Sequence, residues 1–213
     1  MPKEYRTSSR DYLVRAQERL RDGTKEALFY AAFELRCGIE ARMRQYLEVW
    51  DHISRKKKEG WKIVDLGRGV EEAFRLGDRI ARVEVHNESM IFTAIFYYTP
   101  VAPTLQKHGE RLGNYLHSMK GFRESEDPWW NEFRQDLEVI VAQLDGANRG
   151  TLLGPPLVRH EGRKALIDMR LELPGGTDPR AAFSSKFQKL RVTYLDRLPS
   201  ILEPQAHIWN VCR

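Results

Sequence analysis

One long run of regularly spaced apolar residues constrains the fold of this 213-residue chain more than any other feature. Between Leu28 and Trp50, apolar side chains recur at steps of three or four residues, which places them on one face of a long helix. Thr24 can cap the start of this helix, and we expect the helix to continue to the basic residues near Arg55. The apolar residues of this face are Leu28, Ala32, Leu35, Ile39, Met43, Tyr46 and Trp50.

A shorter amphipathic helix precedes the long one. Ser8 or Ser9 can cap its start, and Gly23 stands where a left-handed C-terminal cap is expected. We therefore expect the chain to begin with an antiparallel pair of helices. The apolar face of the first helix consists of Tyr12, Leu13, Ala16 and Leu20.

The middle of the chain alternates between helical and strand patterns. From Ile80 to His86, apolar and polar residues alternate, and the segment from Met90 to Tyr98 is rich in aromatic and β-branched residues. Together these segments predict a β-hairpin over about residues 80–99. Three further helices are predicted: a short one carrying Trp61, Ile63, Leu66, Val70 and Phe74, one from Thr104 to about Lys120, and one from Pro128 to Gly146.

A chain of this length with 41% hydrophobic residues supports one main domain. We predict a mainly α-helical bundle over residues 1–148, with the β-hairpin inserted at about 80–99. Residues 149–213 are predicted to form a mixed α/β C-terminal appendage. Within it, the patterns from Ala165 to Leu173 and from Arg191 to Leu195 predict strands.

Composition excludes several classes of protein. A mean hydropathy of -0.57 argues against an integral membrane protein, and the apolar stretch Met90 to Tyr98 is too short to span a bilayer as a helix. Residues 1–10 lack the apolar segment of a secretory signal. The two cysteines, Cys37 and Cys212, suggest neither a disulfide framework nor a zinc site. We expect a cytoplasmic protein that does not bind membranes.

The common enzyme signatures are also absent. The sequence contains no phosphate-binding loop, no dinucleotide-binding glycine motif, no zinc-protease motif and no esterase nucleophile motif. Its six histidines show no ligand-like spacing. We therefore predict no metal and no cofactor.

The formal net charge of +5 favours polyanionic partners only weakly. The run Lys56, Lys57 and Lys58 is either the solvated end of a helix or a patch that contacts RNA, and Lys120 is a further candidate RNA contact. Between Glu34 and Arg44, alternating acidic and basic residues, Arg42 among them, predict paired surface charges.

The residues best suited to chemistry are Arg111, Asn114 and His117, within the helix predicted from Thr104. A neutral histidine can accept the proton of a ribose 2′-hydroxyl as that oxygen attacks the adjacent phosphate. An arginine can hold the phosphate and stabilise its added negative charge. Asn114 lies three residues from each partner and can orient either one. This set predicts RNA cleavage that requires no metal.

The spacing of this set raises a geometric problem. Six steps of about 100° place Arg111 and His117 roughly 120° apart around a regular helix. Convergence on one phosphate therefore needs the reach of arginine, an irregularity near Gly113, or a two-fold dimer that brings two copies together. Gly109 and Gly113 permit close backbone approach, either to a second copy or within one chain. We predict a homodimer.

Three stretches resemble HEPN domains, a superfamily of helical bundles that includes metal-independent ribonucleases. Arg111 to His117 resembles their signature of an arginine, four to six residues, and a histidine, and LGNYLH at 112–117 is similar to their later motif helix. YLVRAQERL at 12–20 and ALFYAAFELRCGIEAR at 27–42 are similar to their opening helical hairpin. The resemblance covers the chain from residue 8 to about residue 145.

This resemblance implies a HEPN-like bundle and an endoribonuclease of a bacterial toxin or anti-phage defence system. Such an enzyme would leave 2′,3′-cyclic phosphate ends, with RNA as substrate and an antitoxin or defence protein as a possible partner. Active members usually carry a polar residue directly after the arginine, whereas Leu112 follows Arg111 here. The alternative is a catalytically inactive HEPN-like module that binds a partner protein or RNA. A small-molecule enzyme using a groove between bundle and sheet is a third possibility.

Overall fold

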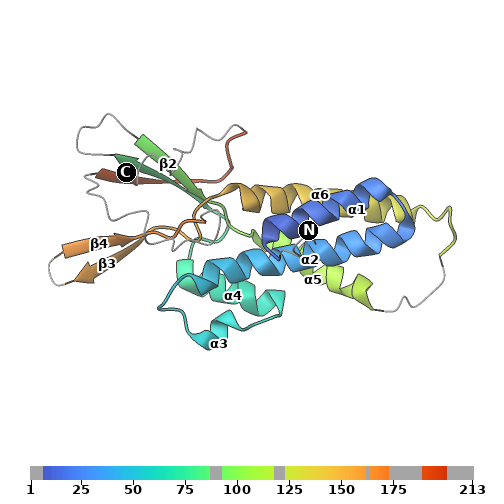
Figure 1. Cartoon of the computed structure of the whole chain (residues 1–213), viewed down its shortest axis with the longest axis horizontal. Coiled ribbons are helices and arrows are strands. Elements are labelled where there is room, and N and C mark those ends of the chain that lie inside the picture. Colours follow the sequence, from blue (N-terminus) through green and yellow to red (C-terminus); the bar gives the residue numbers. More distant parts are fainter. Residues whose placement is uncertain (1–6, 87–92, 118–122, 162–163, 173–188, 201–213) are drawn as a thin grey trace, which may run out of the picture.

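The computed structural model describes residues 7–86, 93–117, 123–161, 164–172 and 189–200. The helices fill one end of the molecule, and two small antiparallel sheets project from the other end (Figure 1). The mainly helical fold class predicted from the sequence is confirmed.

Helices α1 (Ser9–Asp22) and α2 (Lys25–Glu48) form the predicted antiparallel pair. The Ser8 hydroxyl accepts a hydrogen bond from the Asp11 backbone N–H at 3.2 Å, and Gly23 adopts the left-handed conformation that ends α1. The Thr24 hydroxyl caps α2. The predicted extension of α2 to Arg55 is wrong, because α2 ends at Glu48 and Arg55–Lys58 forms a separate single turn, α3.

Helix α2 is the central element of the bundle. It contacts α1, α4 (Ile63–Phe74), α5 (Pro103–Leu112) and α6 (Trp129–Arg149). Figure 1 shows α1, α2 and α6 running side by side, with α3 and α4 at the edge of the bundle. The sequence predicts that Gly146 ends the last helix. Instead α6 continues to Arg149, with Gly150 as its C-cap.

The predicted helix from Thr104 to about Lys120 is wrong at both ends. Helix α5 begins at Pro103 and ends at Leu112, followed by a 3-10 turn, η1 (Gly113–Leu116). The Gly113 N–H donates to the carbonyl of Glu110, three residues back, which tightens the helix into this turn. His117 then has extended backbone angles (φ -99°, ψ 161°) and lies outside any helix.

A three-stranded antiparallel sheet has the order β2-β1-β5, formed by Thr93–Tyr98, Ile80–His86 and Lys189–Leu195. The predicted hairpin is therefore present, and so is the strand predicted at Arg191 to Leu195. Residues 90–92 of the second predicted strand lie outside the described residues. A separate hairpin joins β3 (Leu157–Glu161) to β4 (Lys164–Asp168), so the strand predicted from Ala165 to Leu173 is shorter than expected.

The predicted boundary after residue 148 falls at the end of α6, but the three-stranded sheet contains strands from both sides of this boundary. Strand β5 pairs with β1 along its whole length, with Val83 opposite both Phe96 and Val192. Where the sheet meets the bundle, the rings of Tyr46 and Tyr98 lie 5.3 Å apart. The appendage therefore completes a sheet that the bundle begins.

Gly154 (φ +146°) lets the chain pass close to this junction. A Cβ atom at this position would lie 2.8 Å from Nε1 of Trp50 and 2.9 Å from Cζ of Phe74. The Trp50 indole N–H also donates to the Leu153 carbonyl at 2.9 Å. The residues after α6 are thus held against the end of α2.

Gly109, within α5, and Gly113, at its C-terminal end, both make close contacts within one chain. Gly109 is buried against Ile39 and Ile63, and Gly113 lies against the guanidinium of Arg36. Nη1 of Arg36 donates to the Gly109 carbonyl at 2.9 Å. The two glycines therefore give no support to the predicted homodimer.

Two alanine substitutions should move stability in opposite directions. In Gly109→Ala, the new Cβ would lie 2.5 Å from Cδ1 of Ile63 and 3.2 Å from Cδ1 of Ile39, both of which are packed in the core. We expect a loss of about 1–3 kcal/mol in the free energy of unfolding, measured by urea titration. Gly146→Ala meets nothing within 4 Å inside α6, and should gain about 0.5–1 kcal/mol. Equal effects of the two substitutions would contradict this packing.

Candidate functional site

Arg111, Asn114 and His117 occupy the exposed end of α5 and the turn after it. Because η1 and the extended His117 replace a regular helix, the separation of roughly 120° expected on a helix no longer applies. Nη2 of Arg111 lies 2.5 Å from Oδ2 of Asp136 on α6. Both side chains of this pair are about half exposed. The structure thus has the irregularity near Gly113 that the sequence allows.

The turn that carries Asn114 is anchored by an aromatic cluster. The Tyr115 ring packs 4.5 Å from the ring of Phe133 and 5.9 Å from that of Trp129, measured between centroids. Trp129 stacks on Phe133 at 4.8 Å. The first turns of α6 therefore hold η1 in place, and the three candidate side chains lie on an open surface beside α6.

None of these three residues lines either of two cavities in the described structure, one between α3 and α4 and one beside the sheet. A guanidinium has five N–H donors, so one contact with Asp136 leaves others for a ligand.

Within the described ranges, no three His, Cys, Asp or Glu side chains cluster in a way that could hold a metal ion. None of the described helices has the length and apolar character needed to cross a bilayer.

The predicted RNA contacts at Lys56, Lys57 and Lys58 lie on α3, and Lys120 lies outside the described residues. Lys57 pairs with Glu72 of α4, and Nζ of Lys58 donates to the Glu48 carbonyl at 3.3 Å. A cavity of about 310 Å³, here called the hollow, lies between parts of α3 and α4. It is lined by Lys56, Lys57, Gly60, Asp65, Arg68, Gly69 and Glu72.

Trp61 is a residue that the sequence pattern misplaces. It is predicted on the buried face of a helix, but it lies just before α4 and its side chain is 65% exposed. The buried face of α4 begins instead at Ile63. Because Trp61 precedes the N-cap residue Lys62, it lies outside α4, and its spacing from the apolar residues of α4 does not place it on their buried face. Its position among lysines was the signal in the sequence for a surface role.

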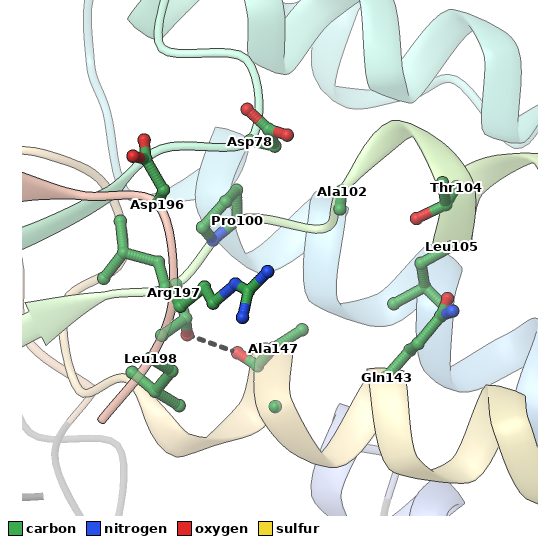
Figure 2. A pocket seen from close by; sticks show the side chains of 13 residues that line it. Asp78, Pro100, Ala102, Thr104, Leu105, Gln143, Ala147, Asp196, Arg197 and Leu198 are labelled. Atoms are coloured by element: carbon green, nitrogen blue, oxygen red, sulfur yellow. Dashed lines mark hydrogen bonds between the residues drawn. The ribbon is translucent and has the colours of Figure 1, made fainter. Parts of the chain in front are cut away.

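A second cavity, of about 280 Å³, opens where the sheet meets α5 and α6. Figure 2 shows Arg197, which follows β5, extending into it, with Asp78 and Asp196 on the rim. Two aspartates and one arginine are among the residues that line this cleft, a balance of charge that does not favour a polyanion. Oε1 of Gln143 is buried at its wall and has no hydrogen-bond partner among the described residues. This is the groove that a small-molecule enzyme would use, but none of the predicted site residues lines it.

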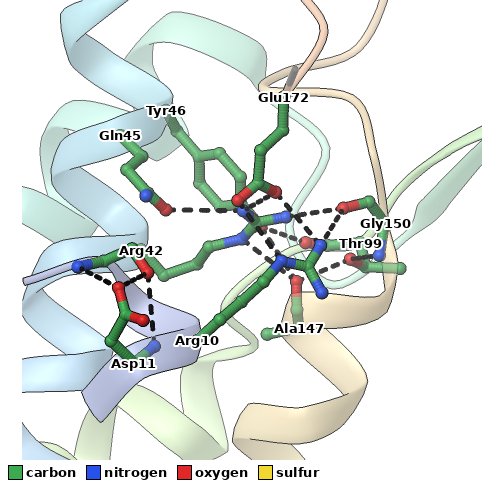
Figure 3. Close-up of polar contacts among 10 residues, drawn as sticks. Arg10, Asp11, Arg42, Gln45, Tyr46, Thr99, Ala147, Gly150 and Glu172 are labelled. Atoms are coloured by element: carbon green, nitrogen blue, oxygen red, sulfur yellow. Dashed lines mark hydrogen bonds and ion pairs between the residues drawn. The ribbon is translucent and has the colours of Figure 1, made fainter. Parts of the chain in front are cut away.

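A buried arginine forms the densest polar cluster in the described part of the chain. Arg42, predicted as a paired surface charge, is fully buried on α2, and that prediction is wrong for this residue. Its guanidinium donates to the carbonyls of Ala147 at 3.1 Å and Gly150 at 2.8 Å, which the end of α6 leaves without helical partners. Figure 3 shows Arg42 and Arg10 converging on Glu172.

These contacts are structural rather than catalytic. Nη1 of Arg42 lies 2.7 Å from Oε2 of Glu172, and Nη2 of Arg10 lies 3.1 Å from the same oxygen. The Tyr46 hydroxyl, which accepts from Arg42, donates to the Thr99 carbonyl. Because these donors and acceptors are satisfied within the chain, the cluster ties α2, α6 and the segment after β4 together.

Glu172 should make folding stability depend on pH. Burial raises its pKa, but the guanidiniums of Arg42 and Arg10 outweigh burial and hold the pKa below its ordinary value. The carboxylate therefore adds stability that is complete above the unfolded-state pKa of about 4.3 and is lost as pH falls through the folded-state pKa. We expect Glu172→Gln to lower the free energy of unfolding by about 1–3 kcal/mol at neutral pH and by less in acid.

The measurement is urea unfolding at about pH 7 and about pH 4, followed by circular dichroism. Glu110→Gln, an exposed carboxylate on α5, is the matched control and should change little at either pH. An equal loss for Glu172→Gln at both pH values would contradict the role assigned to this ion pair.

No protein-family model, curated protein or solved structure matches this chain. What the protein does must therefore be argued from its own residues and their geometry.

Proposed function

We propose that this protein is a metal-independent endoribonuclease of the HEPN-like kind, acting in a bacterial toxin or anti-phage defence system. The observation that carries the proposal is the break at the end of α5. It leaves Arg111, Asn114 and His117 exposed along one short stretch, which Tyr115 anchors against α6, and this supports the proposal. The sequence resemblance to HEPN domains supports the same assignment.

In the proposed reaction, neutral His117 accepts the proton of a ribose 2′-hydroxyl while that oxygen attacks the neighbouring phosphorus. The bond from phosphorus to the 5′-oxygen of the next nucleotide breaks, that oxygen takes up a proton from water, and His117 returns its proton to the solvent. The products are a 2′,3′-cyclic phosphate and a 5′-hydroxyl. Arg111 stabilises the charge that builds on the phosphate oxygens, and Asn114 orients the phosphate or the imidazole.

Asp136 positions Arg111 in the free protein. An ion pair this exposed contributes about 0–1 kcal/mol, so a phosphate can share or displace the carboxylate with little loss of stability. The guanidinium is therefore held near α6 without being withdrawn from a ligand.

A homodimer belongs to the proposal because of the open surface around the three side chains, and not because of the two glycines. The three side chains lie on an open surface, and a second copy against α5 and α6 would supply a wall for the substrate. An antitoxin or defence protein covering this surface would keep the activity silent.

RNA cleavage by the purified protein in excess EDTA tests the proposal. We expect cleavage that leaves 2′,3′-cyclic phosphate ends, with His117→Ala and Arg111→Ala each slower by about 10²- to 10⁴-fold. Val14→Ala, an exposed change on α1, is the control and should cleave at the parental rate. DNA of the same sequence should stay intact, since it lacks the 2′-hydroxyl. Cleavage by His117→Ala as fast as by the parent would refute the mechanism.

The second candidate function is a catalytically silent module that binds a partner protein or RNA. Two observations favour it: Arg111 already has a carboxylate partner in Asp136, and the buried Leu112 stands where active HEPN domains carry a polar residue. Affinity capture from the native host distinguishes the two functions. A stable partner, together with no cleavage by the parent after that partner is removed, would favour the silent module.

A further inference from the structure

An exposed tryptophan lies within the most basic segment of the described surface. Trp61 is 65% exposed and follows directly after Gly60, which lines the hollow between α3 and α4. Nζ of Lys62 lies 5.6 Å from the centroid of the Trp61 ring. Tryptophan is rarely left this open to water, because burial of its ring is strongly favourable. We call the residues around it the Lys–Trp surface: Arg55, Lys56, Lys57, Lys58, Trp61, Lys62 and Arg68.

This surface keeps a positive charge after its internal ion pairs are taken into account. Residues 55–68 contain six basic and two acidic side chains. Arg55 pairs with Glu59, Lys57 with Glu72 and Arg68 with Asp65. Lys56 and Lys62 form no ion pair with any described residue, and Lys58 donates to a backbone carbonyl. Of these lysines, Lys62 lies beside the Trp61 ring and Lys56 lines the hollow.

The size of the hollow suits one small planar group. Its volume of about 310 Å³ is at the lower end of the range for small-ligand pockets. Gly60 and Gly69 line it, and the side chains of Lys56 and Lys57 stand on the α3 side. Trp61 follows Gly60 at the edge of this hollow, so a base stacked on its ring would have Lys62 beside it and Lys56 and Lys57 at the adjoining hollow.

Single-stranded nucleic acid fits these features better than a membrane does. Proteins that bind single strands combine a cationic track for phosphates with aromatic rings on which bases stack. A membrane-surface helix needs a broad apolar face, whereas α3 has the sequence RKKK and the exposed large apolar side chains in this described segment are Trp61 and Val64 alone. The acidic rim of the sheet-side cleft makes it a poor alternative for the same strand.

We propose that the Lys–Trp surface binds single-stranded RNA, with a base stacked on Trp61 and flanking phosphates on Lys56, Lys58 and Lys62. This inference rests on the proposed function, since it assigns a contact for the substrate of that enzyme away from the cleaved bond. Trp61 is then a binding residue whose effect falls on affinity and not on the chemical step.

Binding of a labelled 2′-O-methyl RNA of about 12 nucleotides, followed by fluorescence anisotropy, tests the proposal. The blocked 2′-oxygen prevents cleavage, so binding is measured separately from catalysis. We expect Trp61→Ala to weaken binding by about 5- to 100-fold and Trp61→Phe to retain most of it. With an abasic strand of equal length, Trp61→Ala should have no effect. Lys56→Ala with Lys62→Ala should weaken binding of both strands and make it less dependent on salt, the slope falling by about 0.7 for each phosphate that is no longer neutralised.

Val64→Ala, an exposed apolar change on α4, is the matched control and should bind RNA as the parent does. The inference is overturned if Trp61→Ala binds the base-containing strand as tightly as the parent. It is also overturned if phosphatidylserine vesicles, and not RNA, bind in a manner that depends on both Trp61 and Val64.

The two proposals fail in different ways. If the parent cleaves no RNA but Trp61→Ala still weakens binding of the blocked strand, the Lys–Trp surface stands and the nuclease does not. If His117→Ala abolishes cleavage while Trp61→Ala leaves binding unchanged, the nuclease stands and the Lys–Trp surface does not.

Discussion

The buried guanidinium of Arg42 is the interaction on which the arrangement of helices and sheet depends. An arginine with 0% exposure is costly unless its donors are paired, and here three of the partners lie more than 100 residues away along the chain. The carbonyls of Ala147 and Gly150 lie where α6 ends, and Glu172 follows β4. Arg42 therefore fixes where α6 stops and where the chain turns back toward the sheet.

That constraint explains why the candidate catalytic residues are found at the opposite end of α6. At the C-terminal end of α6, the Ala147 carbonyl accepts hydrogen bonds from Arg42, Tyr46 and Thr99. Its N-terminal end, with Trp129 and Phe133, is free to pack against η1. One end of α6 is thus joined to the sheet, and the other end packs against the turn that carries the candidate residues.

Much of the helical framework and part of the candidate site could be predicted from the sequence, because caps, apolar spacing and motifs are local signals. Ser8, Gly23 and Thr24 set the ends of α1 and α2 as the capping rules require. The addition of β5 to β1 could not be predicted, since the two strands lie about 100 residues apart and neither encodes the identity of its partner. Arg42 was misjudged for the same reason, because its burial depends on distant carbonyls. Likewise, no local pattern shows that Asp136 pairs with Arg111, which depends on how α5 packs against α6.

The three candidate ligand-contacting regions of the described structure differ in charge. The cleft beside the sheet is lined by two aspartates and one arginine, which does not favour a strand of phosphates. The end of α5 offers one guanidinium that Asp136 partly neutralises, which suits a single phosphate held for reaction. The Lys–Trp surface retains several lysines outside its ion pairs and an open ring, which suits a flexible strand held for binding. A nuclease has to hold the strand at one place and act on a phosphate at another. The charge distribution is therefore more consistent with RNA as the ligand than with a small anionic ligand in the cleft.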